Sequence, residues 1–204
     1  MSLVKFHAPC TFILSGCTSS GKTTFIRKLI TNANDMFTSK PNRIVYFYGC
    51  YQPIFEEMPE VLFVKGLPDT FEEYFDPLNH NLLIIDDLQD EVAQSKAVEN
   101  LYTRESHHKN TSVCILNQNL FYQGKHCRTI ALNAHVYVLF KNPRSNSQIK
   151  TLAIQTGIKN LNKFYDDALK EKFGYLVVDL SPFADHEYKI RTHVFPGEYP
   201  IIYK

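Results

Sequence analysis

Apolar residues in this chain follow two patterns. In the first they form short continuous runs that include many β-branched residues, and in the second they recur at helical spacing over longer stretches. The short runs, bounded by glycine, proline or polar residues, are typical of buried strands. They cover residues 11–14, 43–48, 61–64, 81–85, 112–116, 136–140, 175–180 and 190–195. Helical spacing covers residues 24–30, 69–75, 90–106, 146–156 and 160–172.

The two patterns alternate along the chain, which predicts an α/β fold with a central, mostly parallel sheet and helices on both faces. The last two runs are separated by a turn containing Pro182 and predict antiparallel strands at the C-terminal edge of the sheet. Ligands of such folds bind at the carboxyl ends of the strands. A length of 204 residues and a hydrophobic content of 44% suit a single domain spanning residues 1–204.

The segment from Gly16 to Thr23 matches the phosphate-binding pattern G-x-x-x-x-G-K-[ST]. Strand, loop and helix follow one another here in the order that a P-loop requires, which favours a nucleotide site over an ordinary glycine- and serine-rich turn. Lys22 would reach the β- and γ-phosphate oxygens, and the Thr23 hydroxyl would bind Mg²⁺. We therefore expect ATP and Mg²⁺ as cofactors. The predicted nucleotide contacts are Gly16, Cys17, Thr18, Ser19, Ser20, Gly21, Lys22, Thr23 and Thr24.

Two further strand ends carry polar residues suited to hydrolysis. Asp86 and Asp87 follow the four aliphatic residues 82–85. We expect Asp86 to hold Mg²⁺ as the Walker B acid and Asp87 to polarise the attacking water. The alternative is a pair of solvated acids that end a strand. Gln118 follows the run 112–116 and is the candidate sensor of the γ-phosphate, with Asn117 as its substitute.

Other classes of P-loop protein fit less well. A GTPase would carry D-x-x-G where this chain has Asp86-Asp87-Leu88-Gln89, and N-K-x-D where it has Asn162-Lys163-Phe164-Tyr165. A nucleoside or nucleotide kinase would carry an arginine-rich lid, and no segment is rich in arginine. The tandem acids and the polar strand end favour the hydrolysing, multimeric class with a RecA-like (ASCE) fold.

Composition bears on the partners of the protein and on the compartment in which we expect it. Twenty-two basic and 21 acidic residues give a net charge of +1, so any DNA contact must be local or assembled from several subunits. The five cysteines form no C-x-x-C pair, which indicates reduced thiols in an intracellular protein. Residues 1–7 lack a signal-peptide layout, and no apolar run approaches the about 18 residues of a membrane span. We expect a soluble protein that is not secreted.

Several segments together resemble the FtsK–HerA branch of P-loop ATPases, and within it the genome-packaging ATPases of double-stranded DNA viruses and of Polinton or adintovirus-like elements. The resemblance extends over nearly the whole chain. It rests on the P-loop and on residues 81–87, 102–110, 118–125, 128–135, 139–144 and 195–198.

This resemblance implies a homo-oligomeric ring that uses ATP hydrolysis to thread double-stranded DNA into a preformed capsid. It implies a capsid or portal vertex protein as a partner, and a location in the nucleus or viral factory of a host cell or in the virion. The alternatives are a helicase-like or conjugative DNA pump of the same superfamily, and an assembly switch that hydrolyses ATP without translocation.

The sequence departs from the branch at two positions. The acid after the Walker B aspartate is often Glu in the branch but is Asp87 here, which has a shorter reach. An arginine near Ser106-His107 is also missing, so the arginine finger cannot be carried over to that position. We expect Arg104 to supply this catalytic cation, with Arg128 and Arg144 as alternatives. The basic residues Lys125, His126 and Arg128 are the candidate contact with the DNA backbone.

Overall fold

The computed structural model describes residues 4–144 and 146–204. The first three residues, part of the segment expected to lack a secretion signal, lie outside the described residues. The strands are β1 (Thr11–Ser15), β2 (Arg43–Tyr48), β3 (Leu62–Lys65), β4 (Asn81–Asp86), β5 (Thr111–Asn117), β6 (Val136–Phe140), β7 (Tyr175–Asp179), β8 (Ile190–Thr192) and β9 (Ile201–Ile202). The α-helices are α1 (Lys22–Thr31), α2 (Ala33–Met36), α3 (Gln89–Gln94), α4 (Lys96–Asn100), α5 (Ser106–His108), α6 (Cys127–Leu132), α7 (Asn146–Thr156) and α8 (Leu161–Ala168).

Within the described residues the strands form one nine-stranded sheet in the order β3-β2-β4-β5-β1-β6-β7-β8-β9. The strands from β3 to β6 in this order run parallel, while β7, β8 and β9 are added antiparallel. The predicted mixed sheet with an antiparallel C-terminal edge is therefore confirmed. Strand β5 lies between β1 and β4, so the carboxyl ends of these three strands meet at one edge.

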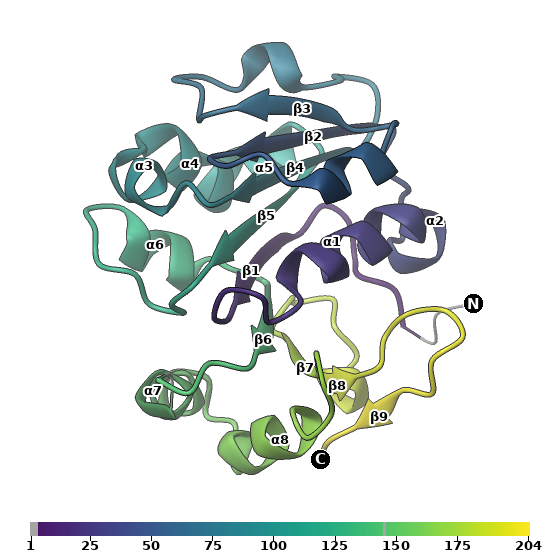
Figure 1. Ribbon diagram of the computed structural model, residues 1–204, viewed down its shortest axis with the longest axis vertical. Helices are drawn as coiled ribbons and strands as arrows, with labels where there is room; N and C mark the ends of the chain where they lie inside the picture. The colour runs from purple at the N-terminus through teal and green to yellow at the C-terminus, as the bar shows by residue number, and fades with distance from the viewer. Residues whose placement is uncertain (1–3, 145) are drawn as a thin grey trace.

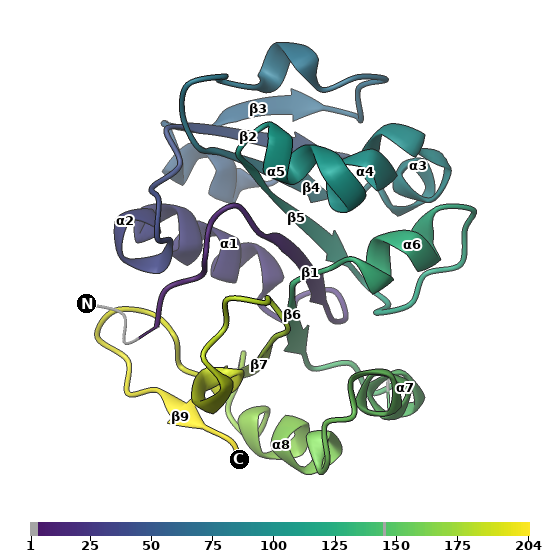
Figure 2. The same ribbon diagram turned by 180° about the vertical axis from the view of Figure 1, so that it is seen from behind.

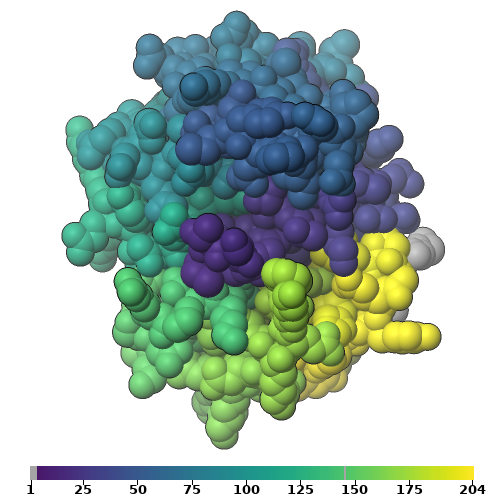
Figure 3. All heavy atoms as spheres, viewed as in Figure 1, coloured from purple at the N-terminus to yellow at the C-terminus, as the bar shows by residue number. Residues whose placement is uncertain are grey.

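Helices cover both faces of the sheet, with α1 and α2 on one face and α3 to α6 on the other (Figures 1 and 2). Strand β4 shows why its sequence is continuously apolar. Leu82 and Ile84 belong to the core cluster beneath α1, whereas Leu83 and Ile85 belong to the cluster beneath α3 to α6. A strand buried on both faces needs apolar residues at consecutive positions. The segment that joins β1 to α1, dark purple in Figure 3, reaches the surface.

The structure corrects the predicted helix over residues 90–106. That stretch is divided into α3, α4, a π-helical turn η3 (Leu101–Glu105) and α5. The break between α3 and α4 occurs at Ser95, whose hydroxyl accepts a hydrogen bond from the backbone N–H of Val98 at 3.2 Å. Serine at this position ends one helix and caps the next, a local effect that competes with helical periodicity.

Other short elements also differ from the expectation. The loop expected around Lys125 to Arg128 contains the start of α6, and the last strand, β9, was not predicted. The segment 69–75 forms a single 3₁₀ turn, η2 (Glu72–Tyr74). Two further 3₁₀ turns are η1 (Pro53–Glu57) and η4 (His186–Tyr188). Among residues 4–144 and 146–204, no helix has the length and apolar character that crossing a bilayer requires.

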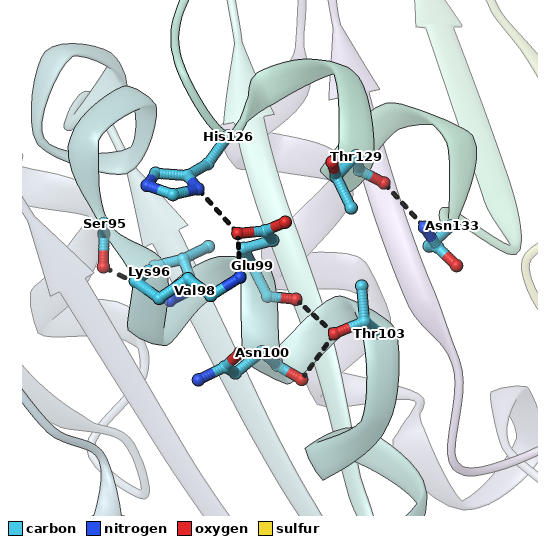
Figure 4. A network of polar contacts seen from close by, with 9 residues as sticks. All are labelled: Ser95, Lys96, Val98, Glu99, Asn100, Thr103, His126, Thr129 and Asn133. Atoms are coloured by element: carbon cyan, nitrogen blue, oxygen red, sulfur yellow. Dashed lines mark hydrogen bonds and ion pairs between the residues drawn. The ribbon is translucent and has the colours of Figure 1, made fainter.

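A polar network joins α4 to the start of α6 (Figure 4), on the face of the sheet opposite α1 (Figures 1 and 2). One carboxylate oxygen of Glu99 accepts hydrogen bonds from Lys96 Nζ at 2.7 Å and from His126 Nδ1 at 2.6 Å. Glu99 and His126 are both buried. The Lys96 hydrogen bond holds the pKa of Glu99 below its ordinary value. The Glu99 carboxylate therefore links α4 to the residue that precedes α6.

We expect Glu99→Gln to lower the melting temperature at pH 7. Because the folded-state pKa of Glu99 is lowered, its stabilising contribution is present above its ordinary value of 4.5 and is lost as the pH falls further. The difference in melting temperature between wild type and variant should therefore become smaller at acidic pH, as measured by circular dichroism melts from pH 7 to pH 4. Glu91→Gln, an exposed position on α3, is the matched control. A difference that stays constant with pH would contradict this role.

Candidate nucleotide-binding site

The loop between β1 and α1 is attached through its backbone to the ends of two neighbouring strands. Gly16 N–H donates to the carbonyl of Asn117 at 3.2 Å, and Cys17 N–H donates to the carbonyl of Lys141 at 3.2 Å. Within the loop, Ser20 N–H donates to the carbonyl of Cys17 at 3.2 Å. These hydrogen bonds hold the loop in one conformation above the sheet.

The two glycines of the motif are required for different physical reasons. Gly21 has a φ of 108°, in the left-handed region that glycine adopts without steric cost. Gly16 lies so close to β6 that an added Cβ would be 2.5 Å from the Cβ of Phe140. Any larger residue at position 16 would push the loop away from the sheet.

Lys22 lies back over the loop that precedes it. Its Nζ donates to the carbonyl of Gly16 at 2.6 Å and to the carbonyl of Cys17 at 3.0 Å. Burial lowers the pKa of Lys22, and the negative charge of Asp86 partly opposes that shift. The ammonium group is therefore held at the mouth of the loop, where phosphate oxygens would replace the carbonyl partners.

Ser20 provides a test of whether the loop suits a phosphate. Its side chain is buried, and its hydroxyl has no hydrogen-bond partner among the described residues. Buried polar atoms normally have a partner, and a phosphate oxygen would supply one for this hydroxyl. An unpaired hydroxyl, a lysine ammonium and a helix N-terminus together fit an anionic phosphate chain.

Asp86 ends β4 and is held by groups from the neighbouring segment. Its Oδ2 accepts hydrogen bonds from the Tyr46 hydroxyl at 2.7 Å and from Gln52 Nε2 at 3.2 Å. Burial raises the pKa of Asp86, and the Tyr46 hydrogen bond partly offsets this rise. Burial also raises the pKa of Tyr46, so its hydroxyl stays protonated as a donor. A bound cation at Asp86 would favour the ionised carboxylate.

Tyr46 and Gln52 were not among the predicted site residues. Tyr46 lies in the middle of an apolar strand, where a buried tyrosine is ordinarily a core residue. Its strand pairs with β4 so that Tyr48 lies opposite Asp86, a register that the local sequence does not reveal. Gln52 could have been proposed as a site residue from the sequence, because it follows shortly after the end of β2, the strand that neighbours β4.

A cavity of about 650 Å³ brings together most of the predicted residues. Residues 18–24 of the P-loop form one wall, and Asp86, Asp87 and Gln118 lie on the side of β4 and β5. Asp87 is exposed and has a φ of 58°, a conformation that aspartate tolerates better than most residues. The remaining lining comes from residues 51–54, Gln89, Leu116 and Phe173.

Cys17, a predicted nucleotide contact, is not among the described residues that line the P-loop cavity; it borders a second, smaller cavity, which Gln118 also borders. The Cys17 thiol donates a hydrogen bond to the carbonyl of Lys141 at 3.1 Å, away from the P-loop cavity. The second cavity, of about 260 Å³, is lined by Cys17, Gln118, Asn119, Asn142, Pro143 and Arg144. The buried Asn142 side chain donates to the Gln118 carbonyl at 2.9 Å and so fixes the backbone of the candidate sensor.

The arginines proposed as catalytic cations lie apart from the P-loop cavity. Arg104 is exposed on η3 and Arg128 is exposed on α6, and neither is among the residues described as lining that cavity. Arg144 borders the smaller cavity beside it. The structure also corrects the candidate DNA contact, because His126 is buried against Glu99 whereas Lys125 and Arg128 are exposed.

Solved structures with the same arrangement of elements contain P-loop NTPases. The genome-packaging NTPase B204 of Sulfolobus turreted icosahedral virus 2, in complex with AMPPCP, superposes with a TM-score of 0.60 at 13% identity, covering 96% of this chain and 97% of that one. This chain has a P-loop NTPase fold. The flagellar accessory protein FlaH of Methanocaldococcus jannaschii gives a TM-score of 0.53 at 10% identity, covering 96% and 91%. No family model and no curated protein matches the sequence.

The conjugation coupling protein TcpA of pCW3, in its ATPγS-bound monomer form, is a further neighbour. Its TM-score is 0.52 at 14% identity, and the match covers 86% of this chain and 58% of that one. At these identities the comparisons establish a shared fold. In the described residues, no group of three or more His, Cys, Asp or Glu side chains is arranged to hold a metal ion by itself.

Proposed function

We propose that residues 1–204 form one Mg²⁺-dependent ATPase domain that drives the packaging of double-stranded DNA into a capsid as a homo-oligomeric ring. The observation that carries the ATPase proposal is that the P-loop, Asp86, Asp87 and Gln118 all face one cavity. Phosphoryl transfer to water requires such a phosphate cradle, a metal-binding acid, a water-orienting group and a polar sensor.

Each residue has a defined task in this proposal. Backbone N–H groups of the loop, the Ser20 hydroxyl and Lys22 bind the phosphates. Thr23 and Asp86 would hold Mg²⁺, which when bound offsets the charge of the β- and γ-phosphate oxygens. Asp87 orients and polarises the attacking water, and Gln118 contacts the γ-phosphate.

The DNA-packaging part of the proposal rests on the sequence resemblance and on the fold shared with B204, which is a genome-packaging NTPase. A net charge of +1 indicates that DNA binding requires several subunits, each contributing a small basic surface such as Lys125 and Arg128. A capsid or portal vertex protein is the expected partner, inside the host cell or its viral factory.

Phosphate release with and without duplex DNA tests this function. We expect ATP hydrolysis that duplex DNA accelerates, and rings in negative-stain images of the protein with an ATP analogue and DNA. Hydrolysis that DNA leaves unchanged would instead favour the nucleotide-dependent assembly switch. Acceleration by single-stranded DNA alone would favour the helicase-like or conjugative pump.

Asp87→Asn is expected to bind ATP as the wild type does but to lower turnover about 10²-fold or more, because the amide cannot accept a proton from the attacking water. Binding is measured by titration calorimetry and turnover by phosphate release. Asp69→Asn, an exposed aspartate outside the cavity, is the matched control and should leave both unchanged. Wild-type turnover by Asp87→Asn would remove Asp87 from the role of base.

A further inference from the structure

Phe173 lies beside the P-loop, in the turn between α8 and β7. Its side chain is 57% exposed, although phenylalanine is normally buried. A Cβ added to Gly21 would lie 3.4 Å from the Cβ of Phe173, so the phenylalanine packs directly on the motif. Phe173 lines the P-loop cavity and also an adjoining cavity of about 290 Å³.

The backbone of Phe173 is in an unusual conformation for a bulky residue. Its φ is 63°, in the left-handed region, although the glycine that would adopt this region freely is the next residue. Gly174 is needed for a different reason, since an added Cβ there would lie 2.3 Å from the carbonyl of Ala168 at the end of α8. Strained residues of this kind concentrate at ligand sites. The turn thus presents an aromatic ring to solvent at a conformational cost.

The proposed function fixes the direction in which a nucleotide lies in the site. The γ-phosphate must lie near Asp87 and Gln118, where hydrolysis occurs, and Lys22 spans the β- and γ-phosphates. The sugar and base must then leave the loop at its other end. Gly21, Thr24 and Phe173 line both the P-loop cavity and the adjoining one, so the passage between the two cavities runs past these residues.

We propose that the nucleobase of the bound nucleotide stacks on the ring of Phe173 and occupies the adjoining cavity. Further aromatic side chains, those of Phe25, Phe140, Tyr175 and Phe195, also line that cavity. An aromatic ring offers a base a flat apolar surface whose contact is worth a large share of the affinity. Lys172 Nζ, 5.1 Å from the ring centroid, lies against the same ring.

Tyr51 is the other exposed aromatic residue of the P-loop cavity, with 58% of its surface accessible. Its neighbour Gln52 donates to Asp86 at 3.2 Å, which places this segment beside the metal-binding acid rather than at the far end of the loop. The Tyr51 hydroxyl is also engaged with Glu56 at 2.9 Å. Phe173 therefore fits the base, whereas Tyr51 borders the γ-phosphate side.

The sequence contains no tryptophan, so the fluorescence of one introduced tryptophan can report directly on ligand binding beside it. Phe173→Trp introduces a single tryptophan at the proposed stacking position. Phe183→Trp introduces one at another exposed phenylalanine, stacked on His7 with ring centroids 4.2 Å apart. With Mg²⁺ present, we expect ATP to quench the fluorescence of Phe173→Trp. Tripolyphosphate, which has the phosphates without a base, should not quench it, and neither ligand should affect Phe183→Trp. Equal quenching of Phe173→Trp by ATP and tripolyphosphate would overturn the stacking role.

Affinity gives a second, independent readout. Phe173→Ala should weaken ATP binding about tenfold or more while leaving tripolyphosphate binding unchanged. Phe173→Gly also removes the ring, and glycine adopts the left-handed backbone conformation without strain. This variant replaces Phe173→Ala in the binding measurement if the alanine variant melts at a lower temperature than the wild type. Wild-type ATP affinity in a folded Phe173→Gly variant refutes stacking. Because the role rests on the proposed function, a wild-type protein that binds neither ATP nor tripolyphosphate would refute that function itself, and the stacking role with it.

Discussion

Replacement of Lys22 by alanine is expected to lower ATP turnover about 10³-fold or more, because the site loses its cation for the β- and γ-phosphates. Lys22 is the only charged side chain between Gly16 and Thr23. In the structure its ammonium group is held at the loop by the carbonyls of Gly16 and Cys17. Phosphate release at saturating ATP measures the loss, and calorimetry shows how much of it reflects weaker binding.

Lys163→Ala is the matched control, since Lys163 is an exposed lysine on α8 outside the lining of the P-loop cavity. It should retain wild-type turnover and binding. Lys163→Ala should melt near the wild-type temperature, because Lys163 is exposed. The melting temperature of Lys22→Ala shows separately what the loss of its two hydrogen bonds to the loop costs in stability. Turnover by Lys22→Ala at the wild-type rate would mean that the observed hydrolysis occurs elsewhere on the chain, or in a contaminant, and would refute the proposed site.

The parts of the fold that depend on local sequence were predictable. The aliphatic run of β4 indicated a strand buried on both faces, and the structure places its alternate residues in the two core clusters. The spacing of Gly16, Gly21 and Lys22 indicated a P-loop because each position meets a local requirement of backbone conformation or charge. The polar ends of β4 and β5 were expected at one sheet edge, where the structure places them.

The parts that depend on contacts between distant segments were not predictable. Tyr46 reaches Asp86 because of the pairing register between β2 and β4, and that register becomes visible only in the assembled sheet. Phe173 lies 152 positions after Gly21 in the sequence numbering and looks like any aromatic residue near a turn. Likewise, the basic residue His126 proved to be buried because Glu99, on another helix, pairs with it. One sequence carries no signal for such pairings.

The proposed ATPase needs a cation to stabilise its transition state. Among the described residues that line the P-loop cavity, Lys22 is the only basic side chain. Arg144 borders the smaller cavity of the same subunit, whereas Arg104 points into solvent from the π-helical turn η3. Single turns of π-helix within α-helices occur frequently at functional sites. An exposed arginine on such a turn would be available to a neighbouring subunit in the proposed ring.

We expect Arg104→Ala to lower DNA-stimulated turnover about 10³-fold or more, as loss of an arginine supplied in trans does in P-loop ATPases. Mixing tests the trans arrangement. Arg104→Ala subunits retain an intact P-loop, and Lys22→Ala subunits retain Arg104. Each variant should be inactive alone. Their mixture should regain activity at the interfaces where an intact P-loop of one subunit meets an intact Arg104 of the next. Arg128→Ala and Arg144→Ala, tested in the same way, are the comparison variants. Full turnover by Arg104→Ala, or no recovery in mixed rings that demonstrably form, would assign the cation to one of the other two arginines or to the same subunit.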